Sequence, residues 1–81
     1  MKFNELDGVK TLRDFEDKGI KKGEIGTIIT SFSKPDEAYE VEFCDETEKP
    51  KAIFPILPKD LELFNPQLKP AYNDLGYASG K

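Results

Sequence analysis

The short, even spacing of turn-forming residues constrains the fold of this chain more than any other feature of its sequence. Glycine, proline and aspartate interrupt the first 60 residues at Asp7-Gly8, Gly19, Gly23, Gly26, Pro35-Asp36, residues 45–50, Pro55 and Pro58. The intervening stretches are rich in β-branched and aromatic residues and are too short for a long helix. This pattern predicts an all-β domain, either a small barrel or a sandwich.

We expect five strands, at residues 8–12, 24–32, 38–44, 51–57 and 62–64, with a helical turn at residues 58–61 before the last one. The third strand has the clearest pattern. Its strict alternation places three apolar side chains on one face and two carboxylates on the other, Tyr39, Val41 and Phe43 against Glu40 and Glu42. One face of this strand is therefore core and the other faces water.

The expected core takes apolar side chains from the first four strands and from the turn before the last one. Its members are Val9, Leu12, Ile25, Ile28, Tyr39, Val41, Phe43, Phe54, Ile56 and Leu61. Phe15 and Ile20, in the charged loop at residues 13–22, fold back over it. Gly26 indicates a bulge or a close backbone approach, and Pro55, which cannot donate to a ladder, indicates an edge or a bulge.

The composition excludes several kinds of active site. The 81 residues allow one small domain and include no His, which rules out serine–histidine and cysteine–histidine catalytic pairs and imidazole metal ligands. Cys44 has no partner for a disulfide and no neighbouring cation to activate it, so a strand-end residue is expected rather than a nucleophile. The acids at residues 45–48 lack the spacing of a calcium loop. We therefore expect no enzyme activity, no metal and no cofactor.

The location is expected to be the cytoplasm. Residues 1–7 do not resemble a signal peptide, and no apolar run approaches the length of a membrane span. A single cysteine fits a reducing compartment.

Negative charge is concentrated in the middle of the chain. Residues 24–50 carry two basic and eight acidic side chains, within a formal net charge of −4. The candidate partner-binding acids are Asp36, Glu37, Glu40, Glu42, Asp45, Glu46 and Glu48. They could form a docking surface for a cationic protein, because a patch of one sign steers association. They could equally be a solvated strand face that discourages edge pairing.

Residues 65–81 differ in composition, being rich in Pro, Gly, Asn, Ser and Lys. They form a C-terminal tail outside the expected domain at residues 1–64. Terminal segments of this kind are commonly mobile. Alternatively, Leu68, Tyr72 and Leu75 are spaced as one stripe of a short helix, which could dock on the barrel or on a partner. Tyr72, Leu75 and Tyr77 are therefore further candidate partner-binding residues.

A second candidate site is the turn at Lys21, Lys22 and Gly23. Together with the strand that follows, it resembles the turn of ribosomal and transcription-factor barrels of the KOW type, which often contacts RNA. Glycines at the entry to a strand are also required by backbone geometry alone. The acidic net charge and the absence of a stacking platform favour this structural explanation.

Four segments resemble a family of short bacterial proteins, classed as a domain of unknown function and expected to form a Src-homology-3-like β-barrel. They are Leu6-Asp7-Gly8-Val9 with Leu12, residues 22–29, residues 38–43 and residues 57–62, together within residues 3–64. The resemblance implies a five-stranded, partly open barrel. Members often carry an apolar residue where this chain has Gly8, which implies a less tightly packed first strand here.

The resemblance also implies a function. Such proteins are often encoded beside toxin-like genes, which implies an immunity or antitoxin role, and a similar barrel occurs in nitrile hydratase subunits and accessory proteins. We therefore expect a non-enzymatic module that neutralises a toxin with a basic surface through the acidic patch. The alternatives are an enzyme-assembly module and an RNA-binding barrel.

Overall fold

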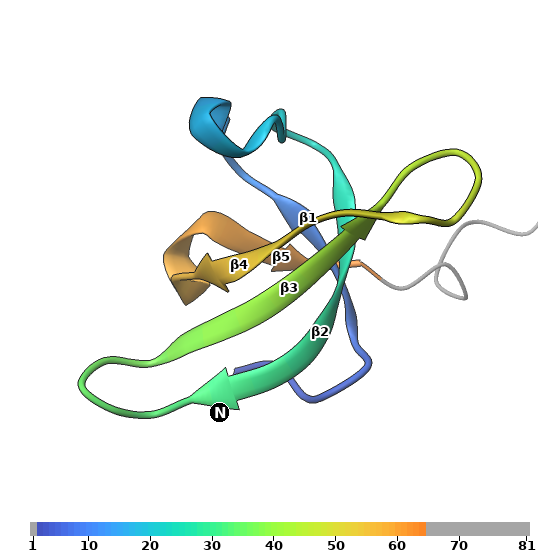
Figure 1. Ribbon diagram of the computed structural model, residues 1–81. Helices are drawn as coiled ribbons and strands as arrows, with labels where there is room; N and C mark the ends of the chain where they lie inside the picture. The colour runs from blue at the N-terminus through green and yellow to red at the C-terminus, as the bar shows by residue number, and fades with distance from the viewer. Residues whose placement is uncertain (1, 65–81) are drawn as a thin grey trace, which may run out of the picture.

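The computed structural model describes residues 2–64 of the chain. Five strands and two short 3₁₀ turns follow one another in the order β1 (Gly8–Thr11), η1 (Glu16–Lys18), β2 (Ile25–Phe32), β3 (Ala38–Cys44), β4 (Pro50–Ile56), η2 (Pro58–Asp60) and β5 (Leu61–Leu63) (Figure 1). The prediction of five strands, with a helical turn before the last, is confirmed. The predicted tail at residues 65–81 lies outside the described residues.

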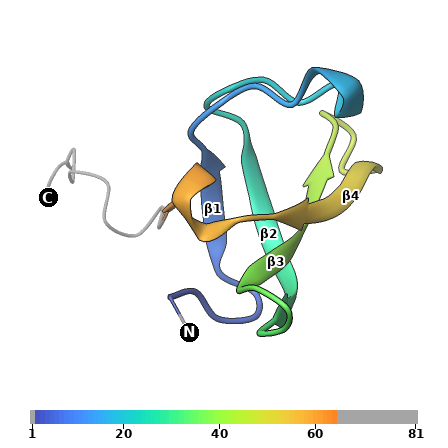
Figure 2. The same cartoon turned by 90° about the vertical axis from the view of Figure 1, so that its left-hand side faces the viewer.

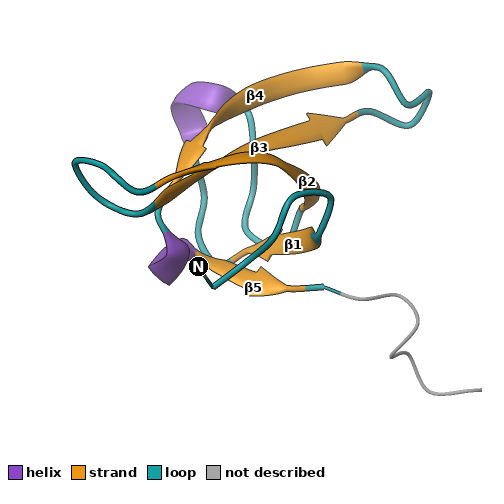
Figure 3. Ribbon diagram, turned by 90° about the horizontal axis from the view of Figure 1, so that it is seen from below, coloured by secondary structure: helices purple, strands orange, loops and turns teal. Residues whose placement is uncertain are grey.

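All neighbouring strands are antiparallel, in the order β4-β3-β2-β1-β5. The sheet is strongly curled: seen from below, β3 and β4 lie across from β1 and β5, with β2 joining the two halves (Figure 3). Strands β4 and β5 are the two edges of the sheet and are not paired with each other. The described residues therefore form a partly open, barrel-like all-β fold, as predicted.

Alternation along β3 places its three apolar side chains in the interior. Tyr39, Val41 and Phe43 are completely buried, and the Phe43 ring stacks on Phe54 of β4 with centroids 5.6 Å apart. Gly26 of β2 lies opposite this cluster. A Cβ atom on Gly26 would stand 2.5 Å from Cγ1 of Val41, so the predicted close approach is confirmed. The irregularity in the β2–β3 pairing lies farther along, between Ile28 and Thr30.

Eight of the ten predicted core residues are buried, and the predictions for Leu12 and Ile25 are wrong. Leu12 is 37% exposed because β1 turns Val9 and Thr11 inward and ends before Leu12. Ile25 is 42% exposed because it pairs with Lys10, on the outer face, and the inward positions of β2 fall to Gly26 and Ile28. In both cases the two residues predicted for the core, Val9 with Leu12 and Ile25 with Ile28, are three positions apart, and a strand with a period of two turns only one of them inward.

The loop between β1 and β2 closes one end of the core. Phe15 and Ile20 form an isolated antiparallel bridge and are both buried, as predicted. Phe15 meets Phe54 edge to face, with ring centroids 5.3 Å apart, and the Arg13 guanidinium lies 4.0 Å from the centre of the Phe15 ring. Figure 2 shows this segment at the opposite end of the sheet from the N-terminal segment.

The free edge of β4 is poorly suited to pairing with another strand. Pro50 begins the strand and Pro55 lies near its end, opposite Glu40, and neither can donate a backbone hydrogen bond. The predicted edge position of Pro55 is thereby confirmed. No helix within residues 2–64 is long and apolar enough to cross a membrane.

Candidate functional site

Glu40 and Glu42 project from the outer face of β3, as the alternation predicts. The register places Glu42 between Thr27 of β2 and Ile53 of β4. Glu40 lies between Thr30 of β2 and Pro55 of β4. The ion pairs found in residues 2–64 do not include either carboxylate. Two acidic side chains thus stand on a rigid strand without a cationic partner in the described part of the chain.

The Asp45 carboxylate, in contrast, is hydrogen-bonded within the β3–β4 hairpin. Its Oδ1 accepts hydrogen bonds from the backbone N–H of Thr47 at 2.8 Å, from the Thr47 hydroxyl at 2.7 Å and from the backbone N–H of Lys49 at 3.0 Å. These bonds hold the pKa of the Asp45 carboxyl below its ordinary value. Asp45 therefore stabilises the turn between β3 and β4. This structural role explains the residue without a partner protein.

Glu37 is likewise part of a structural contact. Its Oε2 accepts a hydrogen bond from the Tyr39 hydroxyl and another, 3.2 Å long, from the backbone N–H of Lys2. These bonds, with the Tyr39 bond contributing most, lower the pKa of Glu37. Glu37 therefore helps to hold the N-terminal segment against β3.

The remaining predicted acids lie in loops at opposite ends of β3. Asp36 is exposed in the β2–β3 loop, and Glu46 and Glu48 are exposed in the β3–β4 hairpin. Asp36 and Asp45 are nine positions apart, which is about 30 Å along an extended chain. The seven acids therefore form a line rather than one pocket. The predicted sites at Tyr72, Leu75 and Tyr77 lie outside the described residues.

At the hairpin end of this line, the acids surround Cys44. Partial desolvation and the nearby carboxylates of Glu42, Asp45 and Glu48 raise the pKa of the exposed Cys44 thiol. A raised pKa keeps the sulfur protonated, and the thiolate is the nucleophilic form. The surroundings of Cys44 thus disfavour nucleophilic chemistry.

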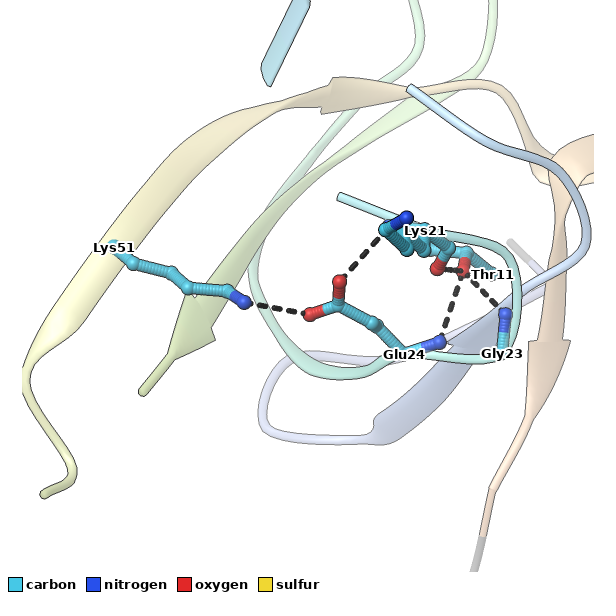
Figure 4. Close-up of polar contacts among 5 residues, drawn as sticks. All are labelled: Thr11, Lys21, Gly23, Glu24 and Lys51. Atoms are coloured by element: carbon cyan, nitrogen blue, oxygen red, sulfur yellow. Dashed lines mark hydrogen bonds and ion pairs between the residues drawn. The ribbon is translucent and has the colours of Figure 1, made fainter. Parts of the chain in front are cut away.

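The Lys21–Lys22–Gly23 turn is held by a polar network beneath it (Figure 4). The buried Thr11 hydroxyl donates to the Lys21 carbonyl oxygen at 2.9 Å and accepts from the backbone N–H of Gly23 at 3.0 Å and of Glu24 at 3.2 Å. The Glu24 carboxylate accepts from the backbone N–H of Lys21 at 2.8 Å and pairs with Lys51 at 2.9 Å.

These contacts give the turn a structural explanation. The Lys21 backbone bond and then the Lys51 side chain lower the pKa of Glu24, which places a stable negative charge beside the lysines. Asp14 adds a second carboxylate, whose Oδ1 accepts from the backbone N–H of Lys22 at 2.7 Å. Two carboxylates at the turn offset the positive charge that an RNA backbone would need.

Two further features bear on chemistry. Within residues 2–64, no group of three or more His, Cys, Asp or Glu side chains is placed to hold a metal ion. An open hollow of about 330 Å³ lies beside η1, lined by Asp14, Glu16, Gly19, Ile20 and Lys21. Its lining carries both signs of charge and does not define a ligand class.

Sequence reasoning did not single out the neutral side chains that flank the two carboxylates. Residues 51–57 are apolar at both parities, so the pattern did not show that Ile53 points outward. The structure settles the question: Phe54 and Ile56 are buried, and Ile53, which pairs with Glu42, points outward and is 48% exposed.

Comparison with known proteins identifies the family. No curated protein and no solved structure matches the chain. Residues 5–63 match a domain of unknown function, DUF4926, over a span that includes all five strands and both carboxylates on the outer face of β3. The chain therefore belongs to the DUF4926 family.

Proposed function

We propose that this chain is a non-enzymatic, cytoplasmic protein-binding module that neutralises a cationic partner, an immunity or antitoxin protein acting on a toxin with a basic surface. The observation that carries the proposal is the position of Glu40 and Glu42 on the outer face of β3, where neither takes part in the ion pairs of the described residues. Both side chains are half-buried, and carboxylates held on a strand need no folding of a loop before they bind. The exposed acids Asp36, Glu46 and Glu48 extend the same field along the strand.

Charge of one sign supports such a role physically. A negative patch accelerates association with a positive one and rejects partners of the same sign. A nuclease offers a suitable target, because its active site is built to hold phosphates. Carboxylates at the spacing of a strand would occupy the place of those phosphates.

The competing functions have less support. For RNA binding, Lys21 and Lys22 stand beside the carboxylates of Glu24 and Asp14. An assembly module of the nitrile hydratase accessory kind would share the barrel, and the strand order with a helical turn before β5 supports a Src-homology-3-like description. Fold likeness alone does not assign a function.

A charge-reversal experiment tests the proposal. The full chain and the variant Glu40→Lys/Glu42→Lys are used as bait in lysate of the source cells, and captured proteins are identified by mass spectrometry. A matched control, Glu5→Lys/Asp17→Lys, raises the formal net charge from −4 by the same amount at exposed positions away from β3. Both variants should stay folded, because substitutions on the surface, away from the core, usually cost within about 0.5 kcal/mol.

We expect the wild type and the control to capture a basic protein that the β3 variant loses. Expression of that protein should slow growth, and co-expression of the wild type should restore it. Capture of the same basic protein by all three baits, with unchanged salt dependence, would refute the proposal. Binding of an RNA oligonucleotide that is lost in Lys21→Glu/Lys22→Glu would instead support the RNA-binding alternative.

A further inference from the structure

The two carboxylates on β3 are each part of a row of side chains that crosses the sheet. In one row the register aligns Gly8 of β1, Thr27 of β2, Glu42 of β3 and Ile53 of β4. The second row aligns Thr30, Glu40 and Pro55. Each carboxylate thus has a threonine on its β2 side and an apolar side chain on its β4 side, and Ile29 of β2, 39% exposed, lies at the irregularity between the two rows.

This arrangement differs from a plain solvated face. Ile53 is 48% exposed although an apolar side chain gains free energy by leaving water. Neighbouring strands lie about 4.8 Å apart, so Ile53 and Pro55 form an apolar border directly beside the acids. A partner that covered only the charges would leave this border in water.

The free edge of β4 is poorly suited to docking by the addition of a partner strand. A partner strand added there would meet Pro50 and Pro55, which provide no backbone N–H. The two prolines weaken pairing at this edge, which favours contact through side chains on the outer face of the sheet. That favours a partner element whose own backbone is already satisfied, such as a helix.

The spacing of the acids matches one helix geometry. Glu40 and Glu42 are two residues apart on an antiparallel strand, so their Cα atoms are separated by about 6.8 Å along it. Side chains four residues apart on a helix are separated by about 6 Å along its axis. A helix lying along β3 could therefore present two basic side chains, at positions i and i+4, to the two carboxylates.

We propose that the outer face of β3 docks a basic amphipathic helix of the partner, with Lys or Arg at i and i+4 facing Glu40 and Glu42 and apolar side chains covering Ile53 and Pro55. This inference rests on the proposed function and adds the class of element that the partner contributes. The charge complementarity sets the orientation, and an apolar flank of the helix covers the border on the β4 side.

The test uses the ¹⁵N-labelled full chain and two synthetic helical peptides. The probe peptide carries Lys at i and i+4 with leucines along one side of them. The control peptide has the same composition, with one lysine moved to the opposite side of the helix. Amide chemical shifts are followed during titration with each peptide, at low and high salt.

We expect the probe to shift the amides of β2, β3 and β4 around Thr27, Glu42 and Ile53, and to bind more tightly than the control peptide. Ile53→Ser should weaken probe binding about fivefold to tenfold, as expected for a lost apolar contact. The matched variant Leu57→Ser, at a residue 43% exposed and outside both rows, should leave it unchanged. Glu40→Gln/Glu42→Gln should abolish binding.

Three results would overturn this inference. The first is equal binding of the two peptides, unaffected by Ile53→Ser and lost with Glu40→Gln/Glu42→Gln, which would show a charge-only surface and leave the proposed function standing. The second is a set of shifts confined to other parts of the chain. The third is no binding of the probe, and the capture experiment decides the proposed function separately.

Discussion

The backbone N–H of Phe3 donates a hydrogen bond to the hydroxyl of Tyr39 at 3.0 Å, and the two rings meet edge to face with centroids 5.1 Å apart. Both side chains are buried. The Tyr39 hydroxyl also accepts from the backbone N–H of Lys2 at 2.8 Å and donates to the Glu37 carboxylate. One side chain of β3 thus attaches the N-terminal segment to the barrel through two hydrogen bonds, while a third links the hydroxyl to Glu37.

Removing this hydroxyl should destabilise the fold. In Tyr39→Phe the buried N–H of Phe3 loses its acceptor, and an unsatisfied buried donor costs about 1–3 kcal/mol. The urea midpoint should fall accordingly. Glu37→Gln keeps an acceptor oxygen for Tyr39 and Lys2 and should have the smaller effect. Equal midpoints for Tyr39→Phe and the wild type would show that the hydrogen bonds of the Tyr39 hydroxyl contribute nothing to stability.

The same contact predicts a loss of stability in alkali. Burial, and then the hydrogen bond to Glu37, raise the pKa of Tyr39 above its ordinary value of 10.0. Below that pH the phenol is protonated in both states, so its contribution is complete. As the pH rises through the raised pKa, the unfolded chain releases the proton first and stability falls. The difference in urea midpoint between the wild type and Tyr39→Phe should therefore narrow above pH 10.

In acid, the dependence of stability on pH has the opposite direction. The pKa of Glu37 is below its ordinary value of 4.5, so its contribution is present above that pH and is lost as the pH falls through the lowered pKa. Glu37→Gln removes this titrating group. The urea midpoint of the variant should therefore fall less in acid than that of the wild type. If the urea midpoint of that variant fell in acid as much as that of the wild type, the assignment of the Tyr39 and Lys2 bonds to Glu37 would be contradicted.

Thr11 offers a test of the turn that resembles an RNA-binding loop. Thr11→Val keeps the shape of the side chain and leaves the Lys21 carbonyl oxygen without the buried hydroxyl, which should cost about 1–3 kcal/mol. Thr11→Ser keeps the hydroxyl and loses one methyl group, about 0.8 kcal/mol. In urea unfolding the valine variant should therefore be the less stable. A valine variant as stable as the wild type would contradict a structural role for the network.

The sequence predicted the sheet because its strands carry local signals. Alternation in residues 38–44 is strict, so the bounds of β3 and the inward positions of Tyr39, Val41 and Phe43 follow from the pattern alone. The burial of Phe3 does not follow from any local pattern. It depends on the Tyr39 hydroxyl, 36 residues away, which only the folded chain brings to the Phe3 backbone. The inward position of Thr11 is hidden for a similar reason, since its partners lie across the next turn.

The candidate site was predicted in part. The outward positions of Glu40 and Glu42 follow from the period of the strand. The local roles of Glu37 and Asp45 could not be read from it, because both depend on the geometry of hydrogen bonds in turns. Composition showed an acidic region. The structure separates Glu37 and Asp45, whose carboxylates accept hydrogen bonds that stabilise turns, from Glu40 and Glu42 on the outer face of β3.

Gly26 provides a prediction about how β2 and β3 pack. A Cβ atom there would stand 2.5 Å from Cγ1 of Val41, 2.9 Å from Cε1 of Phe43 and 3.0 Å from the carbonyl oxygen of Glu42. Gly26→Ala should therefore cost about 1–3 kcal/mol by overpacking. Gly23→Ala is the control for backbone strain, because Gly23 has a φ of +93° and no atom within 4 Å of the added carbon.

A double-mutant cycle with Val41→Ala identifies the cause of the Gly26→Ala effect. Alone, Val41→Ala opens a cavity and destabilises the core. In the Gly26→Ala background the added methyl group enters the space left by Cγ1, so the two effects should fall short of additivity by about 0.5–3 kcal/mol in urea unfolding. The cycle of Gly23→Ala with Val41→Ala should be additive, because the added carbon at Gly23 has no atom within 4 Å. Additivity in both cycles would mean that the close approach of Gly26 to Val41 does not limit the packing of β2 on β3.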